Sequence, residues 1–206
     1  MLHRDNPEVP VSIIVDTMNR LFGEGKIGAF GGSNWTHQRI EEANEYVAKH
    51  NLIPFTVSSP NFGLAEQVDN PWVGQCVTLS GPQNREARKW YQDNKIPVFA
   101  YSALARVFFS GAFKSNESEK AKEILDEAGI KGYFCESNFE RLKRAEALAD
   151  KKGVTVAQIA LAWIFNNPLD TFLLTIPVNQ KQINENVESE NIKLSNEEVL
   201  WLDLEI

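Results

Sequence analysis

The stretch Ile27-Gly28-Ala29-Phe30-Gly31-Gly32-Ser33-Asn34-Trp35 reads as a short buried strand that ends in polar side chains. We expect a helix directly after it, because Thr36 can accept a hydrogen bond from a free amide of a first helical turn. Three further segments downstream also end in small polar or aromatic residues. Parallel strands that lead into helices, with polar groups at the strand ends, are typical of the active-site face of a β/α barrel.

The rest of the chain repeats this alternation. We expect the four strands at 27–32, 54–59, 96–101 and 171–176. Apolar spacing, glycine stops and capping pairs predict the helices, which lie at about 11–22, 36–51, 83–94 and 180–188, with others beginning at Ser137, Thr155 and Ser195. Long loops remain at about 60–82 and 102–117, and loops of this length are usually functional lids or disordered.

Alternating strands and helices indicate an α/β fold with a parallel sheet and right-handed crossovers. A doubly wound sheet is an alternative, but no Gly-x-Gly-x-x-Gly turn follows any of the strands. A complete β/α barrel needs eight strands and about 250 residues. We therefore expect a partial (β/α)8 TIM barrel with about four complete strand–helix units, a terminal helix and a stub at residues 1–3.

Composition sets limits on location and partners. The 206 residues are 43% hydrophobic, which suffices for one globular domain over residues 1–206. The net charge of −7, with both signs interleaved, argues against a nucleic-acid or membrane-surface partner. Cys76 and Cys135 have no metal-ligand spacing, and reduced thiols are favoured over a disulfide. With no signal region and no apolar run near the roughly 20 residues that a bilayer needs, we expect a cytoplasmic protein.

A set of motifs resembles the aldo/keto reductase family. The matching segments, in family order and with near-family spacing, are Leu2-His3-Arg4-Asp5, Gly31-Gly32-Ser33-Asn34-Trp35, Pro97-Val98-Phe99-Ala100-Tyr101-Ser102-Ala103-Leu104, Gln158-Ile159-Ala160-Leu161-Ala162-Trp163, Ile176-Pro177, Asn184-Glu185-Asn186 and Leu194-Ser195-Asn196-Glu197-Glu198. Each motif alone is weak, but the ordered set covers nearly the whole chain. The resemblance implies a β/α barrel that reduces aldehydes and ketones with a nicotinamide cofactor, usually NADPH.

The resemblance places His3 where the family has its catalytic histidine, which donates a hydrogen bond to the substrate carbonyl. The family's catalytic Asp, Tyr and Lys belong to earlier strands that are not among these residues. Met1 then falls inside the fourth barrel strand, which indicates a start codon within a longer gene or a gene fragment. Because a histidine so near a free terminus is more often mobile than preorganised, we expect no activity from the isolated chain.

By the same resemblance, four strand-end residues bind the nicotinamide. Ser33 and Asn34 offer the donor and acceptor that a carboxamide needs, and the alternative for Asn34 is helix capping. Tyr101 stacks on the pyridine ring, unless it is a core tyrosine with its hydroxyl bonded to the backbone. Ser59 stands where the family commonly has a glutamine, and its shorter side chain makes a direct contact less favoured.

The remaining cofactor residues lie on two loops. Ser102, Leu104 and Arg106 follow the third strand, where the family's loop lies against the pyrophosphate, although Arg106 reads equally as a solvated charge. Relatives often have glycine where Val107 stands, which indicates a different loop path. The segment that holds the adenosine 2′-phosphate and adenine in the family here contains Asn179, Lys181, Gln182 and Asn186.

Gln182 stands where arginine is common, which weakens the case for NADP over NAD, while Lys181 either compensates or is an ordinary surface charge. The favoured function is an NADP-dependent reductase of small carbonyl compounds that needs its missing half. The alternatives are a non-catalytic nucleotide-binding fragment and a scaffold subunit with a reductase-like fold. Half a barrel leaves strand edges unpaired, so we expect self-association, or closure of the edges by the N-terminal stub and loops.

Overall fold

The computed structural model describes all residues from 1 to 206 and contains a four-stranded parallel sheet in the order β1-β2-β3-β4. The strands are β1 (Gly32–Ser33), β2 (Ser58–Ser59), β3 (Val98–Ala100) and β4 (Thr171–Leu173). They are shorter than the sequence predicts because the regular ladder is brief. Single hydrogen bonds continue the pairing beyond it, as from the Thr56 amide to the Phe30 carbonyl at 3.1 Å.

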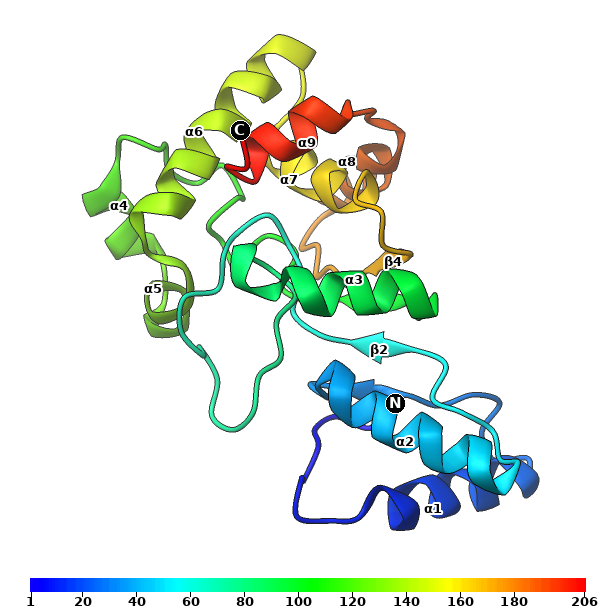
Figure 1. Cartoon of the computed structure of the whole chain (residues 1–206). Coiled ribbons are helices and arrows are strands. Elements are labelled where there is room, and N and C mark those ends of the chain that lie inside the picture. Colours follow the sequence, from blue (N-terminus) through cyan, green and yellow to red (C-terminus); the bar gives the residue numbers. More distant parts are fainter.

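The helices alternate with the strands along the chain, as Figure 1 shows in sequence colours. The α-helices are α1 (Val11–Gly23), α2 (His37–His50), α3 (Arg85–Asn94), α4 (Ser118–Ile124), α5 (Glu127–Tyr133), α6 (Glu136–Lys152), α7 (Val156–Phe165), α8 (Gln180–Glu188) and α9 (Asn196–Leu202). Two 3-10 turns, η1 (Pro82–Asn84) and η2 (Ser189–Asn191), complete the elements. Helices α1 and α2 lie side by side next to β1, whereas α6, α7, α8 and α9 gather at the β4 end (Figure 1).

Capping chemistry explains where several helices begin. The Thr36 side chain accepts from the Arg39 amide, and Thr155 and Ser195 form capping boxes with Gln158 and Glu198, as predicted. Asn179 caps α8 by accepting from the Gln182 amide at 2.9 Å. Local side-chain bonds of this kind satisfy amides that have no partner within the helix.

The predicted start of α6 is wrong. The helix begins at Glu136 behind Cys135, and Ser137 does not cap it. Instead, the Ser137 hydroxyl donates to Glu66 Oε2 at 3.0 Å, so a tertiary contact replaces the expected local one. Helices α4 and α5 were not predicted either. In α5, Gly132 disfavours a helix locally, but a side chain there would come within 3.2 Å of Pro71.

The two faces of the sheet differ in how well they are covered. Val98 and Ala100 are fully buried in one cluster of 38 apolar residues that includes most of α7. Phe99 points to the opposite face, since side chains alternate along a strand, and its register partner Phe172 is 52% exposed. Leu174 lies on the same face and is 49% exposed. The face that a closed barrel would enclose is therefore open at its β4 end.

The two edges of the sheet also differ. Leu2 pairs in parallel with Gly32, through bonds from the Leu2 amide to the Gly31 carbonyl and from the Ser33 amide to the Leu2 carbonyl. The N-terminal stub thus covers the β1 edge, which is one of the two edges that the stub and loops were expected to close. The β4 edge has β3 as its only partner strand. None of the helices combines the length and apolar character needed to cross a bilayer.

Candidate functional site

Asn34 is the centre of a buried polar cluster at the carboxyl end of β1. Its backbone is left-handed, with φ of 57°, a conformation that asparagine tolerates better than most residues. Its Oδ1 accepts from the Tyr101 hydroxyl at 2.7 Å and from the Val77 amide at 3.1 Å. Its Nδ2 donates to Ser33 Oγ at 3.2 Å and to the His3 carbonyl at 3.4 Å. An amide side chain has two acceptor and two donor positions, so all four are filled.

The two serines link the ends of neighbouring strands. Ser33 Oγ donates to the Ser59 carbonyl at 2.9 Å, and Ser59 Oγ donates to the Phe99 carbonyl at 2.8 Å. Both serines are buried. The predicted group of Ser33, Asn34, Ser59 and Tyr101 is therefore brought together by hydrogen bonds across the ends of β1, β2 and β3. Because the strands are parallel, the group lies at the carboxyl ends of the strands, where a β/α barrel carries its site.

Tyr101 follows β3 and is half-buried. Its hydroxyl donates to Asn34 and lies 3.1 Å from Cys76 Sγ, which in turn contacts the side chain of Gln67. Burial raises the pKa of Tyr101 strongly, and the nearby thiol adds to the effect. Tyr101 is thus a neutral hydrogen-bond donor at any physiological pH.

The turn after β3 holds its arginine by internal contacts. Ala105 and Arg106 both have left-handed backbones, with φ of 49° and 61°, which forms a tight turn. The Arg106 guanidinium makes a two-pronged pair with Asp126, including Nε to Oδ1 at 2.8 Å. It also lies over the Trp72 ring, 4.6 Å from the centroid. Arg106 is therefore paired within the protein in this structure and is not a simple solvated charge. Ser102 and Leu104 lie on the same half-buried turn.

The predicted phosphate end is much more open. Asn179 uses its side-chain oxygen as the cap of α8, and the Gln182 side chain accepts from the Val178 amide at 2.9 Å. The Lys181 side chain is 82% exposed, with Glu185 at 3.6 Å. Asn186 is half-buried on α8, and no hydrogen bond joins it to Asn34 or Tyr101. These residues share one helix and its approach, but they form no closed pocket.

His3, the predicted catalytic residue, contributes its backbone to the cluster. Its carbonyl accepts from Asn34, whereas the residue as a whole is exposed. Arg4 reaches in the same direction and donates to the Gln75 carbonyl. The N-terminal stub therefore supports the strand-end cluster from one side, but no hydrogen bond fixes the imidazole in a catalytic orientation.

Comparisons with known proteins agree with this geometry. The sequence model described as the aldo/keto reductase family matches residues 1–203. The chain belongs to the aldo/keto reductase family. Its fold is similar to a solved aldo/keto reductase from Klebsiella pneumoniae in complex with NADP and acetate, with a TM-score of 0.67 and 22% identity. That match covers 98% of this chain and 56% of the Klebsiella chain.

Curated relatives show the same partial coverage. An L-glyceraldehyde 3-phosphate reductase from Escherichia coli O157:H7 is 23% identical over 99% of this chain and 56% of its own length. A putative voltage-gated potassium channel subunit beta from Schizosaccharomyces pombe is also 23% identical, over 92% of this chain and 52% of its own length. The present aldo/keto reductase chain thus spans little more than half the length of these relatives.

The long loop 60–82 provides part of the site that was not predicted from the sequence. Asn61, two residues after β2, is 1% exposed and donates to the Tyr101 carbonyl and to the Tyr133 hydroxyl. The Val77 amide and the Cys76 thiol complete the contacts around Asn34 and Tyr101. The sequence signal that could have identified Asn61 is a polar side chain two residues after a predicted strand. The Val77 backbone amide has no such signal in the sequence.

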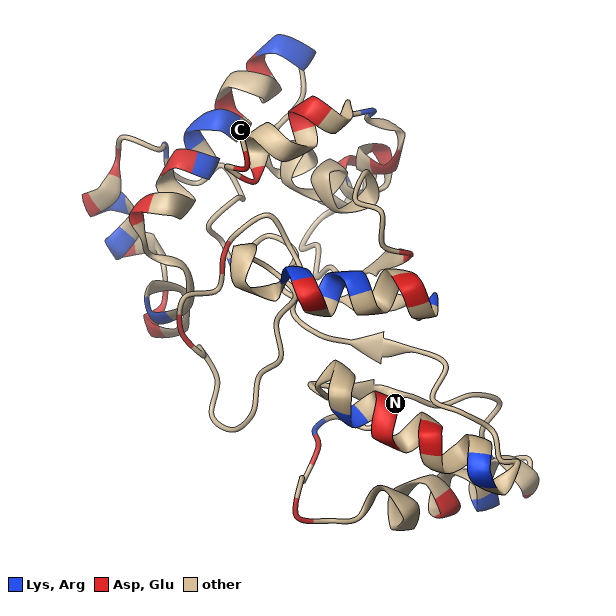
Figure 2. Cartoon of the chain, in the orientation of Figure 1, with Lys and Arg blue, Asp and Glu red and all other residues tan.

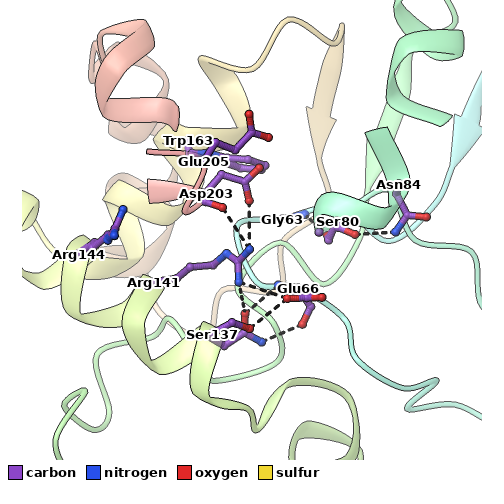
Figure 3. A network of polar contacts seen from close by, with 12 residues as sticks. Gly63, Glu66, Ser80, Asn84, Ser137, Arg141, Arg144, Trp163, Asp203 and Glu205 are labelled. Atoms are coloured by element: carbon purple, nitrogen blue, oxygen red, sulfur yellow. Dashed lines mark hydrogen bonds and ion pairs between the residues drawn. The ribbon is translucent and has the colours of Figure 1, made fainter. Parts of the chain in front are cut away.

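A buried arginine anchors this loop to the helical end of the aldo/keto reductase chain (Figure 3). Arg141 on α6 is 2% exposed, and its guanidinium lies 3.5 Å from Glu66 Oε2 and 3.4 Å from Asp203 Oδ1. Asn138 bonds both the amide and the carbonyl of Glu66. Burial raises the pKa of Asp203, and the positive charges of Arg141 and Arg88 oppose that effect. The loop is therefore fixed at Glu66 by contacts with α6, at a point away from the strand ends.

Three surface cavities lie away from the strand-end cluster. One of about 480 Å³ lies between α6 and α9 beside Trp201, and another of about 310 Å³ lies between α3 and α9 beside Arg88. The third is next to Pro71 and Asp126. These cavities lie on the helical surface and not at the barrel mouth. The strand-end residues suit an amide ligand by chemistry, provided that one of the internal bonds to Asn34 is exchanged for the ligand.

Proposed function

We propose that this chain binds a nicotinamide nucleotide, NADP with NAD as the alternative, at the carboxyl ends of its four strands. The observation that carries the proposal is the cluster of Ser33, Asn34, Ser59 and Tyr101, which joins the ends of three strands around the Asn34 amide. The similar Klebsiella protein contains NADP, which supports the same class of ligand here. In this proposal the Asn34 amide and the Ser33 hydroxyl bind the carboxamide, and the Tyr101 ring packs on the pyridine.

The proposed reaction is reduction of an aldehyde or ketone of a small molecule. When bound, the reduced nucleotide supplies the hydride for this chemistry. The chain's own residues bind and orient it, and His3 is the member of the family's catalytic set present among these residues. Since His3 is exposed, we propose that activity requires the Asp, Tyr and Lys of a further segment, and that the isolated chain is inactive.

A second candidate is a nucleotide-binding or scaffold subunit without catalysis. The exposed His3 favours it, and one similar protein is named as a putative channel subunit. Carbonyl-dependent oxidation of NADPH by the purified chain would exclude this candidate, whereas binding without turnover would favour it over an independent enzyme.

Self-association through the open side of the sheet is also part of the proposal. Residues 171–180 contain no charged side chain, and Figure 2 shows the charged residues mainly on the helices and on loops elsewhere. Phe172, Leu174 and Ile176 expose 52%, 49% and 94% of their surface in this segment. Apolar surface next to an unpaired strand edge favours association. Cytoplasmic location belongs to the proposal as well, supported by the free thiols of Cys76 and Cys135.

Fluorescence titration with NADPH tests the proposed binding. We expect saturable binding by the wild-type chain, and binding at least about tenfold weaker in Asn34→Ala, because about 1.4 kcal/mol corresponds to a factor of ten. Asn44→Ala is the matched control, since the Asn44 amide bonds only the Phe55 backbone at the other end of the sheet. Equal affinity of the two variants, or no saturable binding by the wild type, would refute the site.

A further inference from the structure

The segment Gln75–Val77 lies against the amide that the proposed function assigns to the cofactor. The Val77 amide donates to Asn34 Oδ1 at 3.1 Å, and Cys76 Sγ lies 3.1 Å from the Tyr101 hydroxyl. With the Tyr101 hydroxyl also bonded to Asn34, both lone pairs of Oδ1 are in use. A ligand N–H group can therefore reach Asn34 only if one of these two donors leaves.

Val77 is the donor that can leave. The two groups that accept from Asn34 Nδ2 belong to Ser33 next to it in sequence and to the N-terminal stub, which is paired with β1. Tyr101 is fixed by its position directly after β3 and by the Phe62 amide, which donates to its carbonyl at 3.4 Å. Val77, in contrast, belongs to a loop whose neighbouring tip residue Val73 is 97% exposed.

The segment is held differently on its two sides, by backbone pairing on one side and by side-chain hydrogen bonds on the other. On one side, Asn61 and Thr78 form an isolated bridge, with bonds from the Asn61 amide to the Val77 carbonyl and from the Leu79 amide to the Asn61 carbonyl, both at 2.8 Å. On the other side, Gly74 has φ of 85°, a backbone conformation natural to glycine. The Gly74 carbonyl accepts from Asn70 Nδ2 at 2.6 Å, and the Gln75 carbonyl accepts from the Arg4 guanidinium. A rotation at Gly74 that breaks the Arg4 bond moves Gln75, Cys76 and the N–H of the Cys76–Val77 peptide, while the bridge through the Val77 carbonyl stays in place.

We propose that Gln75–Val77 is a strap that takes the place of the nicotinamide carboxamide and must move aside when the nucleotide binds. The Val77 N–H is the peptide equivalent of the ligand's amide N–H, because both donate to Asn34 Oδ1. Release of the strap also breaks the contact between Cys76 and Tyr101, which frees the Tyr101 ring and hydroxyl. This inference rests on the proposed nucleotide site and adds the element that controls access to it.

Hydrogen exchange gives the strap a distinctive sign. Ligands usually slow amide exchange at their binding sites, whereas here NADPH should speed exchange of the Val77 amide. We expect the peptide that contains residues 73–79 to exchange faster in the presence of NADPH, while peptides of β1 and β3 exchange more slowly. Slower or unchanged exchange at Val77 in a chain that binds NADPH would overturn the strap and leave the proposed function intact.

Variants of the strap give an independent readout. Val77→Pro removes the N–H donor and should bind NADPH about threefold to tenfold more tightly than the wild type, the range of one net hydrogen bond. Cys76→Ala removes the contact with Tyr101 without changing the backbone and should shift affinity in the same direction by a smaller factor. Cys135→Ala is the matched control, because its thiol lies next to Ser137 on α6 and should leave affinity unchanged.

Each combination of results is decisive. Tighter binding by Val77→Pro or Cys76→Ala supports the strap, including the case in which the wild type binds too weakly to measure. Unchanged affinity in both variants, with normal binding by the wild type, overturns the strap alone. No binding by the wild type or by either variant overturns the nucleotide site together with its strap.

Discussion

The two ends of the proposed nucleotide site differ in how their hydrogen bonds are used. At the ends of β1 and β3, Asn34 and Tyr101 lie in a buried cluster in which every position of the amide is filled by the protein. At α8, Lys181 is largely exposed and pairs only with Glu185. At the first end the side chains are held in place but have no free hydrogen-bond positions. At the second end the side chains are free to bind a ligand but are held by few contacts. The proposed binding therefore exchanges a hydrogen bond of the protein at the first end and uses exposed side chains at the second.

The largest effect is expected from the anchor behind the closed end. Arg141→Ala leaves Glu66 and Asp203 without their buried cation and should lower the free energy of unfolding by about 3–5 kcal/mol. Urea denaturation measures the change. Arg20→Ala is the control, because its pair with Glu24 is exposed and its loss should change the free energy of unfolding little. Similar losses in both variants would show that the long loop is not held by Arg141.

This anchor also marks the limit of what the sequence predicts. The caps at Thr36, Thr155 and Ser195 depend on neighbours within a few residues, and the structure confirms them. Ser137 fits the same capping pattern, yet it bonds Glu66, which is 71 residues away in the sequence. A local pattern cannot reveal that a distant carboxylate competes for the same hydroxyl.

The candidate site divides in the same way. Ser33, Asn34, Ser59 and Tyr101 were predicted from the resemblance to aldo/keto reductases together with their place at parallel strand ends, and the structure joins them by hydrogen bonds there. The strap was not predictable, since its essential donor is a backbone amide that every residue except proline has. Arg106 was expected either at the pyrophosphate or as a solvated charge. Its partner Asp126 caps α5, a helix that was not predicted because it contains two glycines.

A second prediction concerns the open side of the sheet at β4, which leads into α8. Phe172→Lys places a charge on the exposed apolar face and should weaken self-association at least about tenfold, which corresponds to about 1.4 kcal/mol. Sedimentation velocity over a range of concentrations measures this. Val73→Lys, at the exposed tip of the long loop, is the control and should associate like the wild type. A wild-type chain that is monomeric at all concentrations would contradict the prediction.

A smaller effect is expected at Lys181. Because its side chain is 82% exposed, Lys181→Ala should weaken NADPH binding only about twofold to fivefold and leave NADH binding unchanged. The ratio of the two dissociation constants, measured at low salt, isolates the contribution of the 2′-phosphate. Lys49→Ala, an exposed lysine on α2, serves as the control. An equal loss for both nucleotides would place the phosphate away from α8.

The smallest effect concerns the pH dependence of the turn that Arg106 holds. The hydrogen bond from Arg106 lowers the pKa of Asp126 below its usual 3.8. A carboxyl whose pKa is lower in the folded state stabilises the fold above the unfolded pKa, and this contribution is lost as pH falls through the folded value. Asp126→Asn keeps the cap on the Gly129 amide but removes the charge. The variant should therefore be slightly less stable than the wild type at pH 7, with the difference vanishing in acid below pH 3.8. The effect is small because the Asp126 side chain is 53% exposed. Thermal unfolding at both pH values, with Asp150→Asn as an exposed control, measures it. Equal stability of the variant and the wild type at pH 7 would mean that the pair with Asp126 contributes nothing, which would leave the Arg106 guanidinium available to a phosphate.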